Sequence, residues 1–453
     1  MGFSPAWRPH RRKKTAQLTA LVANARGEIF ELEGYSAMGM AGEELRPLTL
    51  AHTCPLPHGS ELMYLPDRHP LLWDQEQKRM VTLKFNPYAP DEPLFPVAAF
   101  NSPGYLVTRI TAYAEAPEAG YLPLFSYGAV GWADNGIRSA VILVDPEKRQ
   151  DLRYMPGDRI EAGVRKFRRK LPDNRLCRHL EKCALTYGCP AGKNFFLGRF
   201  EAPLPTSRAC NARCLGCLSL QPAGNIPASQ NRLDFTPRPR EIAEVALTHI
   251  GRVQQAVVSF GQGCEGDPLL AADVLEPAIR KIRSVTREGT VNLNTNASRP
   301  RVLARLLAAG LDSVRISINS IRPECYHAYF RPRDYQFSDV LTSMELVLSH
   351  GRHLALNYLN MPGFTDSAEE IAALKALLRR YPLHLIQWRN LNFDPRRYQR
   401  AMAAAASSSK PLGMERLVQE LRRGFPGLRH GYFNPPKEKF GPGATAGATR
   451  PGG

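Results

Sequence analysis

The chain has 453 residues, 43% of them hydrophobic, a composition typical of a globular protein with two or three domains. No apolar run is long enough to cross a bilayer, so the sequence excludes a transmembrane segment. The 60 Lys and Arg residues outnumber the 42 Asp and Glu residues, and the resulting charge of +18 favours a polyanion such as RNA, or an anionic membrane surface, as a partner.

The first part of the chain is predicted to be rich in strands. Residues 1–14 form a basic tip that we expect to be disordered. In residues 15–150, short apolar runs are separated by glycines and prolines, which predicts a mostly β N-terminal domain. His52, Cys54 and His58 lie close together there, but this spacing is more often incidental than metal-binding.

Residues 151–205 form a basic connector that carries cysteines. Three of them are spaced six residues apart: Cys177, Cys183 and Cys189. Gly188, Pro190 and Gly192 surround the last of these cysteines and should break any helix there.

The loop that follows the connector contains three cysteines within eight residues. Cys210, Cys214 and Cys217 have the spacing Cys-x3-Cys-x2-Cys. Thiolates hold iron–sulfur clusters, and a cubane cluster accepts four ligands. A loop with three thiols leaves one iron open to a substrate or cofactor, as catalytic zinc keeps an open position. A zinc knuckle would need a second cysteine pair, and only Cys264 and Cys325 follow.

Strands and helices alternate over residues 206–395, which predicts a parallel α/β sheet. The predicted strands cover 256–260, 290–294, 313–318, 354–359 and 383–388. The predicted helices cover 237–251, 270–287, 299–309, 323–330, 338–349 and 367–380, the second of them bent or begun late at Pro277. With the approach to Cys210 as a first strand, there are six strand–helix units.

The end of the chain carries less pattern. Residues 396–433 are predicted to form a helical extension, with an amphipathic helix over 414–423. Pro and Gly dominate residues 434–453, which we expect to be a disordered tail.

The cysteine loop and the six units after it resemble the radical S-adenosylmethionine (radical SAM) enzymes, over roughly residues 200–395. The resemblance implies a six-unit partial (βα)6 TIM-type barrel. It also implies a [4Fe–4S] cluster that cleaves S-adenosylmethionine (SAM) to a 5′-deoxyadenosyl radical, and a reductant such as flavodoxin or ferredoxin. One departure is Gly216, because the residue before the third cysteine is commonly aromatic in the family.

The loop after the predicted strand 256–260 is the first candidate for SAM binding. Family members usually carry Gly-Gly-Glu-Pro there, and the simplest alignment puts Asp267 in the place of the acid that meets the methionine ammonium. Glu265 can share this task, while Gly263 and Gly266 let the backbone approach a ligand closely. The alternative is a tight turn with a helix-capping aspartate.

Polar residues also end the next strands. Asn294, Thr295 and Asn296 are similar to the Thr-Asn-Gly segment of the family, and their groups can bond ribose hydroxyls or the methionine carboxylate. Ser317 and Asn319 follow on the next strand, in a place where the family often contacts ribose. Ordinary loop hydrogen bonding is the alternative for each residue. Four polar residues lie close together at the end of the sixth predicted strand, and we expect them to contact the cofactor or the substrate: Gln387, Arg389, Asn390 and Asn392.

The connector thiols suggest a second metal site. Cys177, Cys183 and Cys189 can converge if the turn at the third thiol folds it back, with Cys264 or His179 as a fourth ligand. The alternatives are an auxiliary iron–sulfur cluster, a zinc ion in a mixed Cys/His site, or three unliganded thiols packed as small hydrophobic groups.

These features predict a radical SAM enzyme whose substrate is RNA or another polyanion, or a peptide. The alternative is a non-catalytic, zinc-stabilised nucleic-acid-binding protein. Because thiols needed for metal fit a reducing compartment, we expect a cytoplasmic protein.

Overall fold

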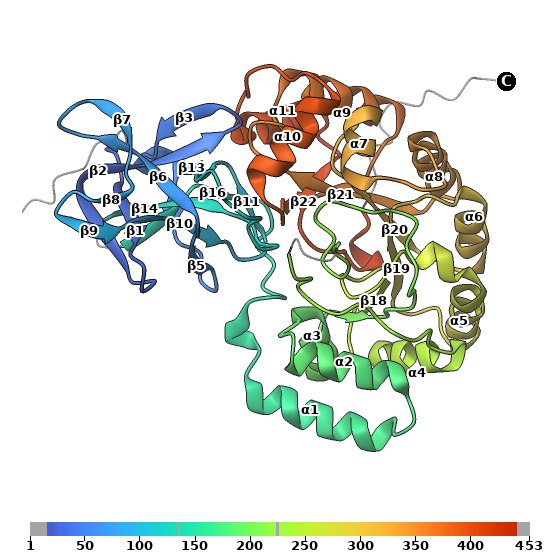
Figure 1. Cartoon of the computed structure of the whole chain (residues 1–453). Helices are drawn as coiled ribbons and strands as arrows, with labels where there is room; N and C mark the ends of the chain where they lie inside the picture. Colours follow the sequence, from blue (N-terminus) through green and yellow to red (C-terminus); the bar gives the residue numbers. More distant parts are fainter. Residues whose placement is uncertain (1–15, 135, 223–225, 442–453) are drawn as a thin grey trace, which may run out of the picture.

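The computed structural model describes residues 16–134, 136–222 and 226–441. The predicted basic tip, residues 1–14, lies outside the described residues, as does the tail from residue 442. Two bodies stand side by side in Figure 1, an antiparallel β domain and a curled parallel sheet ringed by helices. In the described part of the chain, we find no helix with the length and apolar character needed to span a membrane.

The N-terminal domain is built on a twelve-stranded sheet in the order β13-β6-β2-β1-β10-β14-β15-β4, with β3, β5, β7 and β12 paired beside this path. Its first hairpin shows why the chain turns. The Asn24 side chain accepts hydrogen bonds from the backbone of Arg26 and Glu28, and Gly27 adopts a φ of 78° that glycine tolerates.

The strands of this domain are β1 (Thr19–Ala23), β2 (Ile29–Ala41), β3 (Glu44–Pro47), β4 (Cys54–Pro55), β5 (Glu61–Tyr64), β6 (Arg68–Asp74), β7 (Arg79–Thr82), β8 (Phe85–Asn86), β9 (Ala89–Pro93), β10 (Phe95–Phe100), β11 (Tyr105–Val107), β12 (Ile110–Thr111), β13 (Tyr113–Glu115), β14 (Gly128–Ala133), β15 (Gly136–Ser139) and β16 (Val141–Leu143). Short 3-10 helices are η1 (Leu50–His52) and, after the domain, η2 (Leu152–Tyr154).

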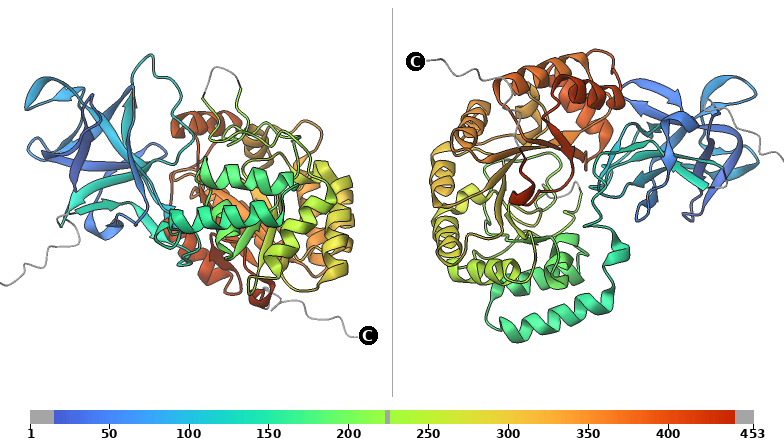
Figure 2. Two further views of the ribbon diagram at one scale, coloured as in Figure 1. Left: turned by 90° about the horizontal axis from the view of Figure 1, so that it is seen from below. Right: turned by 180° about the vertical axis from the view of Figure 1, so that it is seen from behind.

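The connector is helical: α1 (Gly157–Lys170), α2 (Arg175–Leu185) and α3 (Pro190–Leu197). The helix break expected around Cys189 occurs, but a new helix starts there, because Pro190 occupies its first turn, where a missing N–H is harmless. Phe167 of α1 packs against Phe195 and Phe196 of α3. These helices lie beneath the parallel sheet and next to α4 (Figures 1 and 2).

The second body is a seven-stranded sheet whose strands are all parallel and follow one another in chain order. Its strands are β17 (Glu201–Pro203), β18 (Val257–Phe260), β19 (Thr290–Thr295), β20 (Ser313–Ile318), β21 (His353–Asn360), β22 (Leu385–Asn390) and β23 (Arg429–Gly431). The curled parallel sheet agrees with the predicted mixed α/β architecture.

Helices α4 to α9 surround this sheet (Figure 2). The helices are α4 (Pro239–Ile250), α5 (Ala272–Val285), α6 (Pro300–Ala309), α7 (Pro323–Phe330), α8 (Phe337–Ser349), α9 (Ala368–Arg380), α10 (Pro395–Ala405) and α11 (Met414–Gly424), with 3-10 helices η3 (Pro268–Ala271) and η4 (Lys437–Lys439). Pro277 neither starts nor ends α5, which runs through it.

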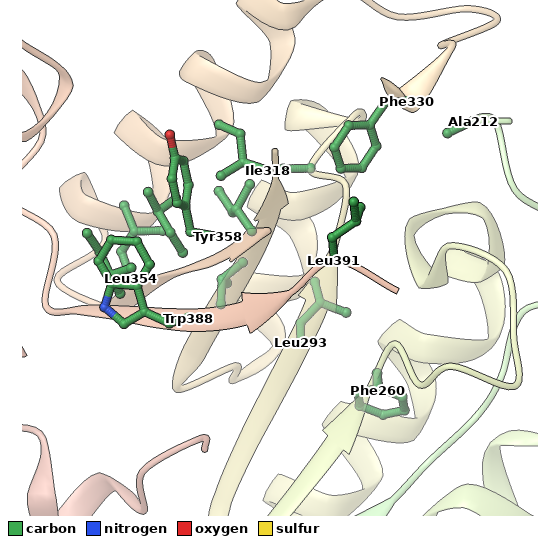
Figure 3. Packing of buried hydrophobic residues seen from close by; sticks show 14 of the residues in the cluster. Ala212, Phe260, Leu293, Ile318, Phe330, Leu354, Tyr358, Trp388 and Leu391 are labelled. Atoms are coloured by element: carbon green, nitrogen blue, oxygen red, sulfur yellow. The ribbon is translucent and has the colours of Figure 1, made fainter. Parts of the chain in front are cut away.

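Large apolar side chains fill the space between sheet and helices (Figure 3). Phe260, Tyr358 and Trp388 come from three strands of the sheet and are almost completely buried. Tyr358 and Trp388 meet edge to face at 5.7 Å between ring centroids. Each such side chain contributes about 1.5–3 kcal/mol through burial.

The N-terminal domain is bound to the carboxyl ends of β21 and β22. Val107 of β11 donates its N–H to Asn390 and accepts a hydrogen bond from Asn360 through its carbonyl. Nearby, Arg68 and Asp394 form an ion pair at 3.1 Å, and both side chains are buried. Charged and amide side chains therefore fix the contact between the two bodies.

Residues 434–441, predicted to belong to a disordered tail, are part of the described structure. Asn434 is buried and donates to Glu201 at 2.8 Å, beside the first strand of the sheet. It also accepts a hydrogen bond from Gln387 on β22. The Pro and Gly content of this segment does not prevent order here, because hydrogen bonds to β17 and β22 hold Asn434 in place.

Candidate active site

The cysteine loop starts at Cys210, seven residues after the end of β17, at the carboxyl edge of the parallel sheet, and its three cysteines are free. The loop backbone is held from outside the sheet, because Arg213 donates to the Phe330 carbonyl and Leu215 to the Tyr329 carbonyl. Both acceptors lie at the end of α7. The backbone on either side of Cys214 is thus fixed against the end of α7.

The environment of the thiols suits a cationic metal centre. Burial raises the pKa of Cys210 to about 11, and the nearby Asp267 adds to this effect. Burial, and then Cys210 and Cys217, raise the pKa of Cys214 well above its ordinary value. Three thiolates at this place therefore need a positive partner, which the irons of a cluster supply. Arg232 Nη2 also lies 3.5 Å from the Cys217 sulfur.

Glu265 holds two strand-end segments together. One of its carboxylate oxygens accepts from the backbone N–H groups of Thr206 and Ser207, after β17. The other accepts from those of Gly261 and Gln262, after β18. Burial raises the pKa of Glu265 to about 7, while these hydrogen bonds favour the charged form.

Asp267 likewise joins its own turn to the end of the next strand, β19. It caps η3 by accepting from Leu269 N, and it accepts from the Thr295 hydroxyl at 2.8 Å and from Asn296 N at 2.7 Å. These donors occupy both carboxylate oxygens, so the capping alternative is present in the structure. Its charge still reaches Cys210, whose pKa it helps to raise.

Gly266 permits the close approach of this turn to the cysteine loop. Its N–H donates to the Ser207 carbonyl at 2.7 Å, and Asp267 N donates to the Ala209 carbonyl. A Cβ atom at Gly266 would lie 1.9 Å from the Ala209 oxygen, which no side chain can avoid. At Gly263, a Cβ atom would meet the end of the Gln230 side chain at 2.8 Å and Leu218 at 3.5 Å, both of them side chains rather than backbone.

The polar segment after β19 is bonded to the cysteine loop. Asn296 donates to the side chain of Asn211, which lies inside that loop. Asn294 instead donates to the Gly261 carbonyl at 3.1 Å, while Thr295 binds Asp267. The sequence reasoning missed Asn211, although its place directly after Cys210 was a usable signal.

Ser317 and Asn319, both predicted to contact the ribose, point to different parts of the structure. Ser317 accepts a long hydrogen bond of 3.5 Å from Asn357 of β21, among the polar side chains inside the sheet. Asn319 is fully buried and donates to the Cys325 carbonyl of α7 and to the Tyr398 hydroxyl of α10. It faces the helices rather than the site, because the chain turns into α7 directly after the strand.

The interior of the curled sheet carries two arginines. Arg315 of β20 donates to Gln387, and burial lowers its pKa to about 9. Arg389 of β22 donates to Asn357 and lies 3.6 Å from the centre of the Tyr432 ring. The pair brings two positive charges into the interior, where Glu201 acts on Arg315 in the opposite direction to Arg389.

Gly216 leaves no room for an aromatic side chain. A Cβ atom there would lie 3.0 Å from both the Asn392 carbonyl and the Tyr329 hydroxyl. The loop packs tightly against α7 and the segment after β22 at this position. This packing explains why glycine stands where the family commonly has an aromatic residue.

Comparisons with known proteins agree with this arrangement. Residues 204–374 match the family model described as the Radical SAM superfamily. The GTP 3',8-cyclase of Heliobacterium modesticaldum is 32% identical over 180 residues, which are 39% of this chain and 50% of that relative. The GTP 3',8-cyclase of Corynebacterium glutamicum is 31% identical over 163 residues, 35% of this chain and 40% of that relative. The chain thus spans half or less of the length of these curated relatives.

Solved structures also show similarity. The hydrogenase maturase HydG from Carboxydothermus hydrogenoformans has 15% identity and a TM-score of 0.34, over 60% of this chain and 73% of that chain. Streptococcus suis SuiB has 11% identity and a TM-score of 0.37, over 70% of this chain and 72% of that chain.

Proposed function

Residues 204–374 are a radical SAM domain, and on that premise we propose that this chain is an enzyme that cleaves SAM reductively. Cys210, Cys214 and Cys217 would hold a [4Fe–4S] cluster and leave one iron open to SAM. When bound, the cluster and SAM supply a 5′-deoxyadenosyl radical that abstracts hydrogen from a substrate. The observation that carries the proposal is the set of free thiols on a fixed loop at the carboxyl edge of the sheet.

The surrounding residues would bind and orient SAM. Asp267 is proposed to act twice, holding Thr295 and Asn296 in place and presenting negative charge near Cys210 to the methionine ammonium. Glu265 would position the strand-end backbone that shares this task. Asn294, Thr295, Asn296 and Ser317 remain candidates for the ribose and carboxylate groups.

The proposed substrate is anionic. Arg315 and Arg389 lie inside the sheet, where they favour a nucleotide or another phosphate-bearing molecule over an uncharged peptide. The names of the curated relatives, GTP 3',8-cyclases, point in the same direction. RNA stays a less direct candidate, because it is suggested by net charge alone.

We interpret the parallel sheet as the six-unit partial barrel of the superfamily, formed by β17 to β22, with β23 as an addition at its edge. A reductant such as flavodoxin or ferredoxin would supply the electron. A reducing compartment such as the cytoplasm would preserve the cluster thiolates.

The test is an anaerobic assay. The full chain is reconstituted with iron and sulfide, reduced, and given SAM, and 5′-deoxyadenosine is measured. A brown protein that bleaches on reduction and releases 5′-deoxyadenosine is expected. A colourless zinc protein that leaves SAM intact would instead support the non-catalytic nucleic-acid-binding alternative.

A further inference from the structure

A second group of metal-ligand side chains lies beside the site, formed by His179, Cys183 and Cys264. His179 and Cys183 are one helical turn apart on α2 and so share a face. Cys264 reaches them from the turn after β18. His179 Nε2 is 3.4 Å from the Cys183 sulfur and 3.5 Å from the Cys264 sulfur, and the three ligand atoms all lie within 4.8 Å of one another.

These distances match a single tetrahedral ion. With Zn–S near 2.3 Å and Zn–N near 2.0–2.1 Å, the edge between a sulfur and a nitrogen ligand of a zinc tetrahedron is about 3.5 Å. A cubane cluster needs ligands farther apart, because each thiolate binds a different iron. The geometry therefore favours zinc over an auxiliary cluster.

The candidate fourth ligand is Cys189, whose sulfur lies outside the group of atoms within 4.8 Å but whose backbone is bonded to that of Cys183. It precedes α3, and its N–H donates to the Cys183 carbonyl at 2.9 Å, which brings the turn back to α2. Cys177 has no such position. Six residues separate Cys177 from Cys183, which is about one and two-thirds turns of helix, so the two side chains point in different directions. Cys177 is buried in the apolar core.

We propose that His179, Cys183, Cys189 and Cys264 bind one zinc ion. The ion joins helices α2 and α3 to the turn that carries Glu265 and Asp267, and so stabilises that turn. His179 also lines a surface pocket with Arg178 and Arg232, so this side of the site lies close to solvent. This site does not depend on the proposed SAM chemistry.

Metal content tests the site without any activity assay. The full chain with C210A, C214A and C217A is purified without oxygen, so that the cysteine loop contributes no iron. One zinc per chain is expected by mass spectrometry. Adding H179A, C183A, C189A or C264A should lower zinc occupancy by about tenfold or more, whereas Cys177→Ala, on the same helix, should leave it unchanged.

Two further measurements keep the result interpretable if a variant folds poorly. His179→Cys retains a ligand and should restore zinc, and circular dichroism checks the helices. Cobalt in place of zinc should show thiolate charge-transfer bands that weaken in C189S. Retained iron and sulfide, a metal-free protein, a Cys183–Cys264 disulfide, or loss of zinc in C177A would each overturn the proposal.

Discussion

The side chain of Asn296 donates a hydrogen bond of 2.9 Å to the side chain of Asn211, across 85 residues of sequence. Asn211 also donates to Ser298 and to Asp334, so one amide joins the cysteine loop to the segment after β19 and to the segment after α7. The position of the thiols is therefore set by tertiary contacts of the residue next to Cys210.

Replacing Cys210, Cys214 or Cys217 by Ala should each abolish the cluster and all SAM cleavage, because no other thiol is placed to take over. Iron content, visible absorption and 5′-deoxyadenosine release measure the effect. Cys54→Ala, a free cysteine of the β domain, is the control and should behave as wild type. Wild-type cleavage by any of the three loop variants would contradict the cluster assignment.

Asp267→Asn should leave the cluster intact and weaken SAM binding by about 1.5–3 kcal/mol, the value of a hydrogen bond to a charged group. Titration calorimetry under anaerobic conditions measures the affinity. Thr295→Val separates the two roles of Asp267, because it removes a hydroxyl donor at 2.8 Å but keeps the charge. Equal losses in both variants would assign Asp267 to positioning alone, and unchanged affinity would remove it from the site.

Gly266→Ala should disrupt the cysteine loop, because the new Cβ atom would meet the Ala209 oxygen at 1.9 Å and must displace the backbone before Cys210. We expect reduced iron incorporation and a lower melting temperature. Gly120→Ala is the matched control, since no atom lies within 4 Å of its added Cβ. Normal iron content in G266A would show that the loop tolerates the shift.

Arg389→Ala should weaken binding of an anionic ligand by about 1.5–3 kcal/mol, roughly tenfold to a hundredfold in Kd. GTP serves as the probe, in equilibrium dialysis at two salt concentrations. Arg416→Ala, on the exposed face of α11, controls for net charge. If wild-type protein does not bind GTP, or if both variants bind it equally, the anionic nucleotide proposal fails.

Asp394→Asn should destabilise the contact between the two bodies by up to about 3–5 kcal/mol, because it leaves the buried Arg68 with only the longer ion pair to Glu115, at 3.7 Å. Thermal unfolding monitored by fluorescence and limited proteolysis measure the effect. Glu161→Gln, which removes an exposed ion pair with Arg165 on α1, should change stability by less than about 0.5 kcal/mol. Similar melting curves for the two variants would contradict this prediction.

The local sequence determined the class of the protein. Three cysteines within eight residues make a spacing that needs no tertiary information, and the alternation of strands and helices after them predicts a parallel sheet. The radical SAM family match and the curled parallel sheet confirm these predictions. Both signals are readable because each depends on residues that are neighbours in the chain.

Only the tertiary structure decided the partners of individual polar side chains. The even spacing of Cys177, Cys183 and Cys189 suggested one trio, but Cys177 faces the apolar core, and His179 and Cys264 meet Cys183 instead. Asn319 likewise turns to the helices. The direction of a side chain depends on helix rotation and on where a strand bends, and packing against distant segments sets both of these.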